Sequence, residues 1–224
     1  MSDAIVVVGM ARTPLGGMQG SLSAMTASEL GAHALKAALE RSQVAAADVD
    51  ETIMGCVLPA GVGQAPARQA SIGAGMPLNT GATTINKVCG SGMKAIMLGM
   101  DIIKAGSASV VAAGGMESMT NAPYLLPNTR AGMRLGHGQV KDHMFLDGLE
   151  DAYDKGQLMG TFAEATATKY EFSREAQDSY TIESLNRAKA AIAEGKFSEE
   201  VEAVTIKTRK GEVTVDTDEQ PGNA

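Results

Sequence analysis

The sequence predicts an α/β fold with a mainly parallel sheet, because short apolar segments alternate with helical segments through its first half. Residues 4–8 form a continuous apolar run rich in β-branched residues, which is typical of a strand covered on both faces. The predicted strands span residues 4–8, 52–58, 83–86 and 109–113, and the predicted helices span residues 26–41, 66–73 and 91–104.

Local signals mark where these helices begin. Thr26 and Glu29 have the spacing of a capping box, and Pro66 occupies a first turn, where its missing N–H costs nothing. The helix over residues 91–104 has an apolar stripe on one face, and we expect that face to pack inward. The stripe consists of Met93, Ile96, Met97, Met100 and Ile103.

The second part of the chain differs in charge. Residues 1–118 carry a net charge of −1, whereas residues 119–224 carry −6 at about twice the charge density. We therefore predict a core domain over residues 1–118 and a more solvated unit over residues 119–224. The second unit is predicted to begin with a long connection from Met119 to about residue 153. Two helices are predicted next, over residues 161–170 and 173–193, with Ser173 as the N-cap of the second. A hairpin of strands 201–207 and 212–217 is then predicted around Arg209, Lys210 and Gly211, and the polar end over 218–224 is predicted to have neither strand nor helix.

Composition excludes several classes of protein. The chain has 224 residues, of which 44% are hydrophobic, but no apolar run is long enough for a membrane span. Its start lacks the basic flank of a secretory signal, and two cysteines are too few for a disulfide scaffold. A net charge of −7 disfavours nucleic-acid binding, because phosphate contacts need Lys and Arg. We expect a soluble, cytoplasmic protein.

Cys89 is the strongest candidate for a catalytic residue in the sequence. It lies between the predicted strand 83–86 and the helix 91–104, so its thiol should feel the positive end of the helix dipole, which favours the reactive thiolate. Gly90 and Gly92 leave the backbone open to a substrate. The first N–H groups of the helix lack intrahelical acceptors, and we assign the oxyanion contact to this entrance at Cys89 itself. The pattern indicates a nucleophile elbow with Cys in place of Ser; the alternative is a small buried cysteine beside a glycine turn.

The other candidate side chains have simpler interpretations. Cys56, within a predicted strand, reads as a buried core residue. His33 is expected to be a satisfied or exposed residue of an amphipathic helix. His137 and His143 lie in the long connection, where a contact role is favoured over catalysis.

Motifs spread over the whole chain resemble those of the thiolase family, and in particular of its biosynthetic acetyl-CoA acetyltransferases. In the first part they are Ala11-Arg-Thr-Pro14, Gly55-Cys-Val-Leu-Pro-Ala-Gly61, Pro66-Ala-Arg-Gln-Ala70, Asn86-Lys-Val-Cys-Gly-Ser-Gly92 and Gly114-Gly-Met-Glu-Ser-Met119. In the second part they are Asp147-Gly-Leu-Glu-Asp151, Met159-Gly-Thr-Phe-Ala-Glu164, Ser173-Arg-Glu-Ala-Gln-Asp178 and Lys210-Gly.

This resemblance implies half of a five-layered αβαβα thiolase fold, with an α+β loop domain inserted. It implies a reversible ping-pong acyl transfer in which Cys89 is acetylated by acetyl-CoA, and a second acetyl-CoA then takes the acetyl group to give acetoacetyl-CoA. Coenzyme A and acetyl-CoA are substrates, and neither a permanently bound cofactor nor a metal is implied. The family's activating histidine and second cysteine lie in Gly-His-Pro and Cys-x-Gly-Gly-Gly motifs, which are absent here. We therefore expect the N-terminal half with most of the loop domain, inactive without a C-terminal half as partner.

Site residues other than Cys89 follow from the resemblance alone. Leu149 and Met159 match positions that line the coenzyme A tunnel, and Leu158 stands where biosynthetic members often have histidine. Gly222 stands near the position of an Arg that contacts the nucleotide, and Arg209 and Lys210 are either phosphate contacts or an exposed basic turn. The loop from Asn121 to Asp142 corresponds to the loop through which thiolases form homotetramers; the alternative is a flexible surface loop.

Three other functions remain open at this stage. A longer-chain 3-oxoacyl-CoA thiolase is compatible with Leu158 and Ala165. A noncatalytic module acting only in assembly is compatible with the missing motifs. A β-ketoacyl synthase shares the fold and the nucleophile, but the segment 114–119 and the loop domain favour a thiolase.

Overall fold

The centre of the structure is a three-stranded parallel sheet. The computed structural model describes residues 4–209 and 211–223. Strand β1 (Glu51–Gly55) lies between β2 (Gly81–Ile85) and β3 (Val111–Gly115), so the order is β2-β1-β3. All three strands are paired in parallel over five residues each, with Gly55 opposite Ile85 and Gly115. The carboxyl ends of the three strands therefore lie at one edge of the sheet, which is where ligands bind in open α/β sheets.

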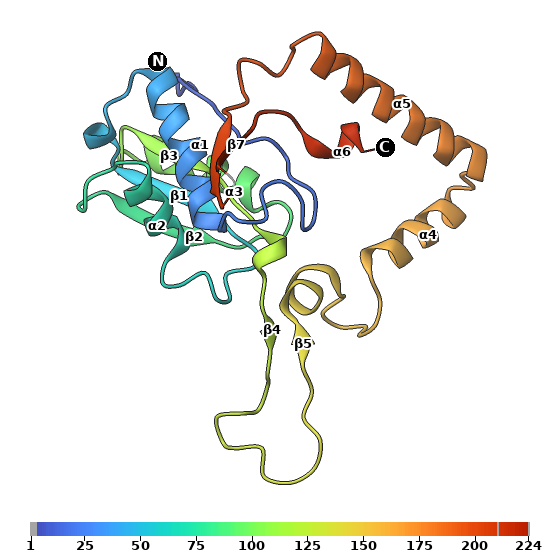
Figure 1. Ribbon diagram of the computed structural model, residues 1–224. Helices are drawn as coiled ribbons and strands as arrows, with labels where there is room; N and C mark the ends of the chain where they lie inside the picture. The colour runs from blue at the N-terminus through green and yellow to red at the C-terminus, as the bar shows by residue number, and fades with distance from the viewer. Residues whose placement is uncertain (1–3, 210, 224) are drawn as a thin grey trace.

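Helices cover both faces of this sheet (Figure 1). Helix α2 (Pro66–Gly73) connects β1 to β2, and α3 (Ser91–Lys104) connects β2 to β3. Because the two connections run in opposite directions along the sheet, right-handed crossovers put the helices on opposite faces. Helix α1 (Ala27–Ser42) packs against α2 and begins with the predicted capping box of Thr26 and Glu29. The bounds predicted for α2 and α3 are confirmed.

The main hydrophobic core lies on the α1 and α2 side of the sheet. Strand β1 is the most deeply buried element, since four of its five residues are buried. Small side chains let α1 and α2 approach one another closely: a Cβ at Gly31 of α1 would lie 3.3 Å from the Cβ of Ala70 on α2. The buried members of this core are Ala27, Leu35, Val49, Met54, Cys56, Ala67, Ala70, Ala74, Met76 and Met116.

The strand predicted over residues 4–8 is wrong. These residues form no strand, and Val7 is 79% exposed. The segment leads instead to the end of α1, where an added Cβ at Gly9 would meet the Ala38 carbonyl and Ser42. Residues 4–8 pair with neither edge of the described sheet, so their β-branched side chains have no second layer to cover them.

The prediction that the apolar stripe of α3 packs inward is also wrong. The helix buries Ser91, Ala95 and Gly99, which recur every four residues, whereas Met93 is 72% exposed. A Cβ at Gly99 would lie 3.0 Å from Val111 Cγ1, so only small residues fit between this helix and the sheet. The larger apolar stripe faces away from the sheet; we call Met93, Ile96, Met97 and Met100 the α3 outer face, and all four are exposed.

The second part of the chain extends away from this core, with the arm below it and helices α4 and α5 to one side in Figure 1. A long arm projects from the body, and its base is the short pair of strands β4 and β5. Helices α4 and α5 bury none of their residues, and Ser173 caps α5 as predicted. The polar C-terminal segment, expected to lack a helix, contains the four-residue α6. The bounds are 3-10 helices Ala46–Asp48 and Met119–Asn121, β4 Tyr124–Leu125, β5 Lys141–Asp142, π-helix η3 Phe145–Leu149, α4 Met159–Lys169, α5 Arg174–Ala193, β6 Val204–Thr208, β7 Gly211–Val215 and α6 Glu219–Gly222.

The β6–β7 hairpin returns to the N-terminal part of the chain. It forms as predicted, although Lys210 lies outside the described residues. Val204 and Ile206 of β6 pack with Leu22 in a second, smaller core. The same region contains an ionic cluster that we call the Arg12 latch: Arg12 Nε contacts Glu200 at 2.7 Å, and its Nη1 and Nη2 atoms contact the Asp218 carboxylate at 2.7 and 3.0 Å. The latch therefore joins residues near the two ends of the chain.

The Arg12 latch should weaken in acid. Burial alone raises the pKa of Asp218, but hydrogen bonds from Arg12 and from the Leu15 amide outweigh it, so the pKa lies below its ordinary value. A carboxyl whose pKa is lowered by folding stabilises the fold above the unfolded-state pKa and loses that contribution as the pH falls. We predict that the free energy of unfolding decreases from about pH 5 to about pH 3. Asp218→Asn should flatten this decrease in urea titrations.

The matched control for this prediction is Asp178→Asn. Asp178 is an exposed residue of α5 that pairs with Arg174 of its own helix. Its variant should keep the pH dependence of the wild type. Equal pH dependence in the wild type and Asp218→Asn would show that the latch contributes nothing.

Candidate active site

The structure presents Cys89 at the surface, in the turn between β2 and α3. The turn consists of residues 86–90, and Cys89 is exposed. It follows the carboxyl end of β2 and immediately precedes Gly90, the N-cap of α3. The predicted strand–turn–helix placement is therefore present, and the alternative of a buried cysteine at position 89 does not hold.

Very close packing sets the position of the α3 entrance. A Cβ at Gly55, the last residue of β1, would lie 2.5 Å from Ser91 Cβ. A Cβ at Gly115, the last residue of β3, would lie 3.1 Å from the Gly92 Cα. Such distances leave no room for side chains at Gly55 and little at Gly115. The first turn of α3 thus rests directly on the ends of two strands.

The residue before Cys89 has a strained backbone. Val88 has φ of 46°, a left-handed conformation that is a genuine outlier for a β-branched residue. Strain of this kind costs about 1–3 kcal/mol and persists only where surrounding structure imposes it. One constraint is Asn86, whose Oδ1 accepts a 2.8 Å hydrogen bond from the Val88 amide. Strained turns of this type are concentrated at functional sites.

Two backbone N–H groups at the start of α3 have no acceptor among the described residues. The Lys94 amide donates to the Gly90 carbonyl, which begins the helical ladder, but the Gly92 and Met93 amides donate to no described residue. Gly90 has no side chain with which to cap them. Free amides at the positive end of a helix stabilise negative charge on a bound group. The oxyanion contact assigned to Cys89 stays a prediction, and these two amides are further candidates for that role.

Glu117 holds together the loops that follow β1 and β3. Its carboxylate accepts hydrogen bonds from the Val57 amide at 2.8 Å and the Leu58 amide at 2.9 Å. Its sequence context alone did not mark Glu117 as a functional residue, although it is part of the segment 114–119 on which the resemblance rests. The signal that could have identified Glu117 is an acidic side chain directly after an apolar, glycine-rich strand, with no basic residue close in sequence to pair with it.

Cys56 is a buried core residue, as predicted. It is 1% exposed, and its Sγ atom lies 3.6 Å from Glu117 Oε1. Burial is the largest cause that raises the pKa of the Cys56 thiol, and the neighbouring Glu117 charge adds to it, giving a pKa of about 12. A thiol in this environment stays protonated and unreactive near neutral pH.

The residues predicted to contact coenzyme A lie in a separate loop. Leu149 ends η3, and Leu158 precedes α4, whose first residue is Met159. A backbone bridge between Glu150 and Leu158 brings the two ends of this loop together. No hydrogen bond within the described chain joins the loop to Cys89.

His143 ties this loop region to the loop after β1. It is 4% exposed, its Nδ1 lies 2.6 Å from Asp147 Oδ2, and its Nε2 accepts a 3.3 Å hydrogen bond from the Ala60 amide. Because Nε2 accepts, the proton of a neutral ring must reside on Nδ1 and point to Asp147. Its role in contacts agrees with expectation. His137 is exposed on the arm, and the half-buried His33 has no described partner for its Nε2.

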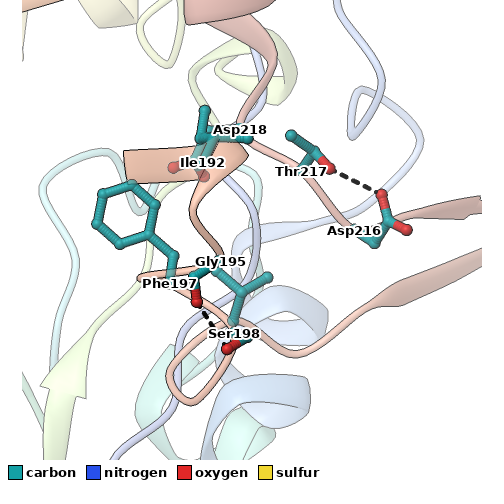
Figure 2. Close-up of a pocket in the computed structure, with 8 residues that line it drawn as sticks. Ile192, Gly195, Phe197, Ser198, Asp216, Thr217 and Asp218 are labelled. Carbon is teal, nitrogen blue, oxygen red and sulfur yellow. Dashed lines mark hydrogen bonds between the residues drawn. The ribbon is translucent and has the colours of Figure 1, made fainter. Parts of the chain in front are cut away.

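Figure 2 shows a pocket of about 170 Å³ whose lining includes Asp218 of the Arg12 latch. Asp218, which lines it, is already paired with Arg12. The lining contains no predicted site residue, so this pocket provides no support for a catalytic role. The lining residues are Ile192, Gly195, Phe197, Ser198, Val201, Asp216, Thr217 and Asp218.

Comparison with known proteins assigns the family. The profile described as "Thiolase, N-terminal domain" matches residues 5–224. The chain belongs to the thiolase family. Proteins named acetyl-CoA acetyltransferase from Cupriavidus necator, Saccharomyces cerevisiae and Thiocystis violacea are 51%, 50% and 48% identical to this thiolase chain and cover 98–99% of it. The chain spans about half the length of these curated relatives, 56% of each.

The described part of this thiolase chain offers neither a metal site nor a membrane span. No group of three or more His, Cys, Asp or Glu residues within residues 4–209 and 211–223 could hold a metal ion. None of the helices in the same ranges combines the length and the apolar character needed to cross a membrane.

The two cysteines of the thiolase chain should differ sharply in their reactivity toward alkylating reagents. With a pKa of about 12, roughly one Cys56 thiol in ten thousand is ionised at pH 8, and it is also buried. We predict that iodoacetamide modifies Cys89 in the folded chain and modifies Cys56 only after denaturation. Peptide mass spectrometry at pH 8, with and without urea, measures both. Equal modification of the two cysteines in the folded chain would contradict the structure.

Proposed function

We propose that this chain is the nucleophile-bearing half of an acetyl-CoA acetyltransferase and that Cys89 receives the acetyl group. The observation that carries the proposal is the exposed Cys89 in a strained turn at the entrance of α3, next to amides that donate to no described residue. The names of relatives that are 48–51% identical over nearly the whole chain support the same substrate.

The first half-reaction follows from this geometry. The Cys89 thiolate attacks the thioester carbonyl of acetyl-CoA, and the negative charge on the carbonyl oxygen is stabilised by backbone N–H groups at the start of α3. The carbon–sulfur bond to coenzyme A then breaks, the coenzyme A thiolate leaves and takes up a proton, and Cys89 keeps the acetyl group. One thioester is exchanged for another, so the step costs little energy.

The second half-reaction needs a base that we assign to a C-terminal half. A second acetyl-CoA must lose a proton from its methyl carbon before that carbon attacks the acetyl group on Cys89. His143 is engaged with Asp147 and Ala60, Cys56 is buried and protonated, and His33 lies on α1. We therefore assign to that half the activating histidine and second cysteine, which the resemblance to thiolases places in Gly-His-Pro and Cys-x-Gly-Gly-Gly motifs.

The α3 outer face supports such a partner. Met93, Ile96, Met97 and Met100 form a contiguous helical stripe, and their exposure leaves a large apolar surface next to Cys89. Exposed apolar surfaces of this kind mark sites of protein association. We propose that the C-terminal half covers this face, which would bring its base close to the α3 entrance and thus to Cys89.

The remaining contacts are proposed from the resemblance and from exposure. Leu149, Leu158 and Met159 line the pantetheine arm of coenzyme A. The arm within residues 121–142 carries exposed apolar side chains, including Leu135, which is fully exposed, and we propose that it mediates homotetramer formation. Two unpaired cysteines suit a reducing compartment, so we propose a cytoplasmic location.

Acetylation of Cys89 tests the proposed function. The chain is incubated with acetyl-CoA, alone and together with a separately produced C-terminal half of the Cupriavidus necator relative, and its intact mass is measured. We expect one added acetyl group on Cys89 in the assembled protein, none in Cys89→Ser, and a full adduct in the matched control Cys56→Ser. The chain alone should show no turnover. Absence of an adduct in the assembled wild type would favour a noncatalytic module.

A further inference from the structure

We propose that Ser91 is a positioning residue for Cys89: its side chain holds the strained turn that presents the thiol at the entrance of α3. This inference rests on the proposed function, because it concerns the same nucleophile. The Ser91 hydroxyl accepts a 2.8 Å hydrogen bond from the Lys87 amide and donates a 2.6 Å hydrogen bond to the Val88 carbonyl. The Ser91 amide donates to the same carbonyl at 3.0 Å. Both functions of the hydroxyl are thus used within the turn.

Ser91 does not behave as an ordinary serine at a helix start. A capping serine accepts hydrogen bonds from amides of the first helical turn, as Ser173 does at α5, where its hydroxyl accepts from the Ala176 amide. Ser91 is instead the first residue of α3, and its hydroxyl points back to Lys87 and Val88. The Gly92 and Met93 amides donate to no described residue, because the N-cap Gly90 has no side chain that could accept from them. The Ser91 hydroxyl therefore holds the turn that precedes it and takes no part in capping α3.

The sheet in turn fixes Ser91. The residue is 4% exposed, and its Cβ lies so close to Gly55 that a side chain there would overlap it. Ser91 cannot move toward β1, so its hydroxyl remains where it meets the Val88 carbonyl. A continuous set of contacts thus runs from the end of β1 through Ser91 to Val88, the residue bonded to Cys89. Without the hydroxyl, Val88 can relax to a negative φ and Cys89 moves with it.

The test is the pH profile of Cys89 alkylation in the 224-residue chain, with iodoacetamide as the probe. Ser91→Ala should slow alkylation of Cys89 by roughly 3- to 10-fold at pH 7, because the sulfur leaves the positive end of the helix. The matched control is Ser71→Ala, which removes another buried serine hydroxyl that is hydrogen-bonded to Thr52 on the α2 side of the sheet. Ser71→Ala should lower stability but keep the wild-type profile.

A second substitution tests the role of the strain itself. Glycine adopts a left-handed conformation without steric cost, so Val88→Gly in the Ser91→Ala background should restore the wild-type alkylation profile. A purely structural role for Ser91 would not produce this rescue. An unchanged profile in Ser91→Ala, an equal slowing in Ser71→Ala, or failure of Val88→Gly to restore the rate would each overturn the proposal.

One measurement does not depend on whether the variants fold. In the wild type, the hydroxyl of Ser91 is the acceptor for the amide of Lys87, an exposed residue. We expect slow hydrogen exchange at the Lys87 amide, and rapid exchange there would contradict the inference. Because none of these measurements involves acetyl-CoA, their failure is distinguishable from failure of Cys89 to become acetylated in the assembled protein.

Discussion

The contact between the first turn of α3 and the ends of β1 and β3 is the constraint on which the candidate site depends. Gly55 and Gly115 bring the backbones of both strands against Ser91 and Gly92. This close approach fixes the start of the helix to the sheet, and the connection from β2 must then reach it within a few residues. The left-handed Val88 is the consequence, and Cys89 follows it at the surface.

The same constraint explains why the large apolar residues of α3 are exposed. A helix that lies so close to a sheet can place only small side chains between them, and α3 uses Ser91, Ala95 and Gly99. Its methionines and Ile96 must then face away, where a second layer is needed to cover them. The exposed valines of residues 4–8 have the same need. A chain that spans about half the length of its curated relatives is consistent with both surfaces being interfaces.

Signals that depend on neighbouring residues predicted the structure well. Thr26 and Glu29 form the expected capping box, α2 begins at Pro66, and α3 has its predicted bounds, because caps, prolines and periodicity act within a few residues. The strand over residues 4–8 and the inward orientation of the α3 outer face were predicted wrongly. An apolar pattern predicts that a surface will be covered, but it does not indicate which layer or which chain covers it. The place of Cys89 in the turn between β2 and α3 was predicted from the order of strand, turn and helix. Glu117 and Ser91, in contrast, act through contacts that the sequence alone does not reveal.

The most direct test of this account is the free energy of unfolding of Gly55→Ala, compared with Gly160→Ala. An added Cβ at Gly55 would lie 2.5 Å from Ser91 Cβ, whereas one at Gly160, within the exposed helix α4, would meet nothing within 4 Å. We predict that Gly55→Ala loses about 2 kcal/mol or more through overpacking, while Gly160→Ala gains up to about 1 kcal/mol in urea denaturation. A Gly55→Ala chain as stable as the wild type would contradict the claim that this contact sets the α3 entrance.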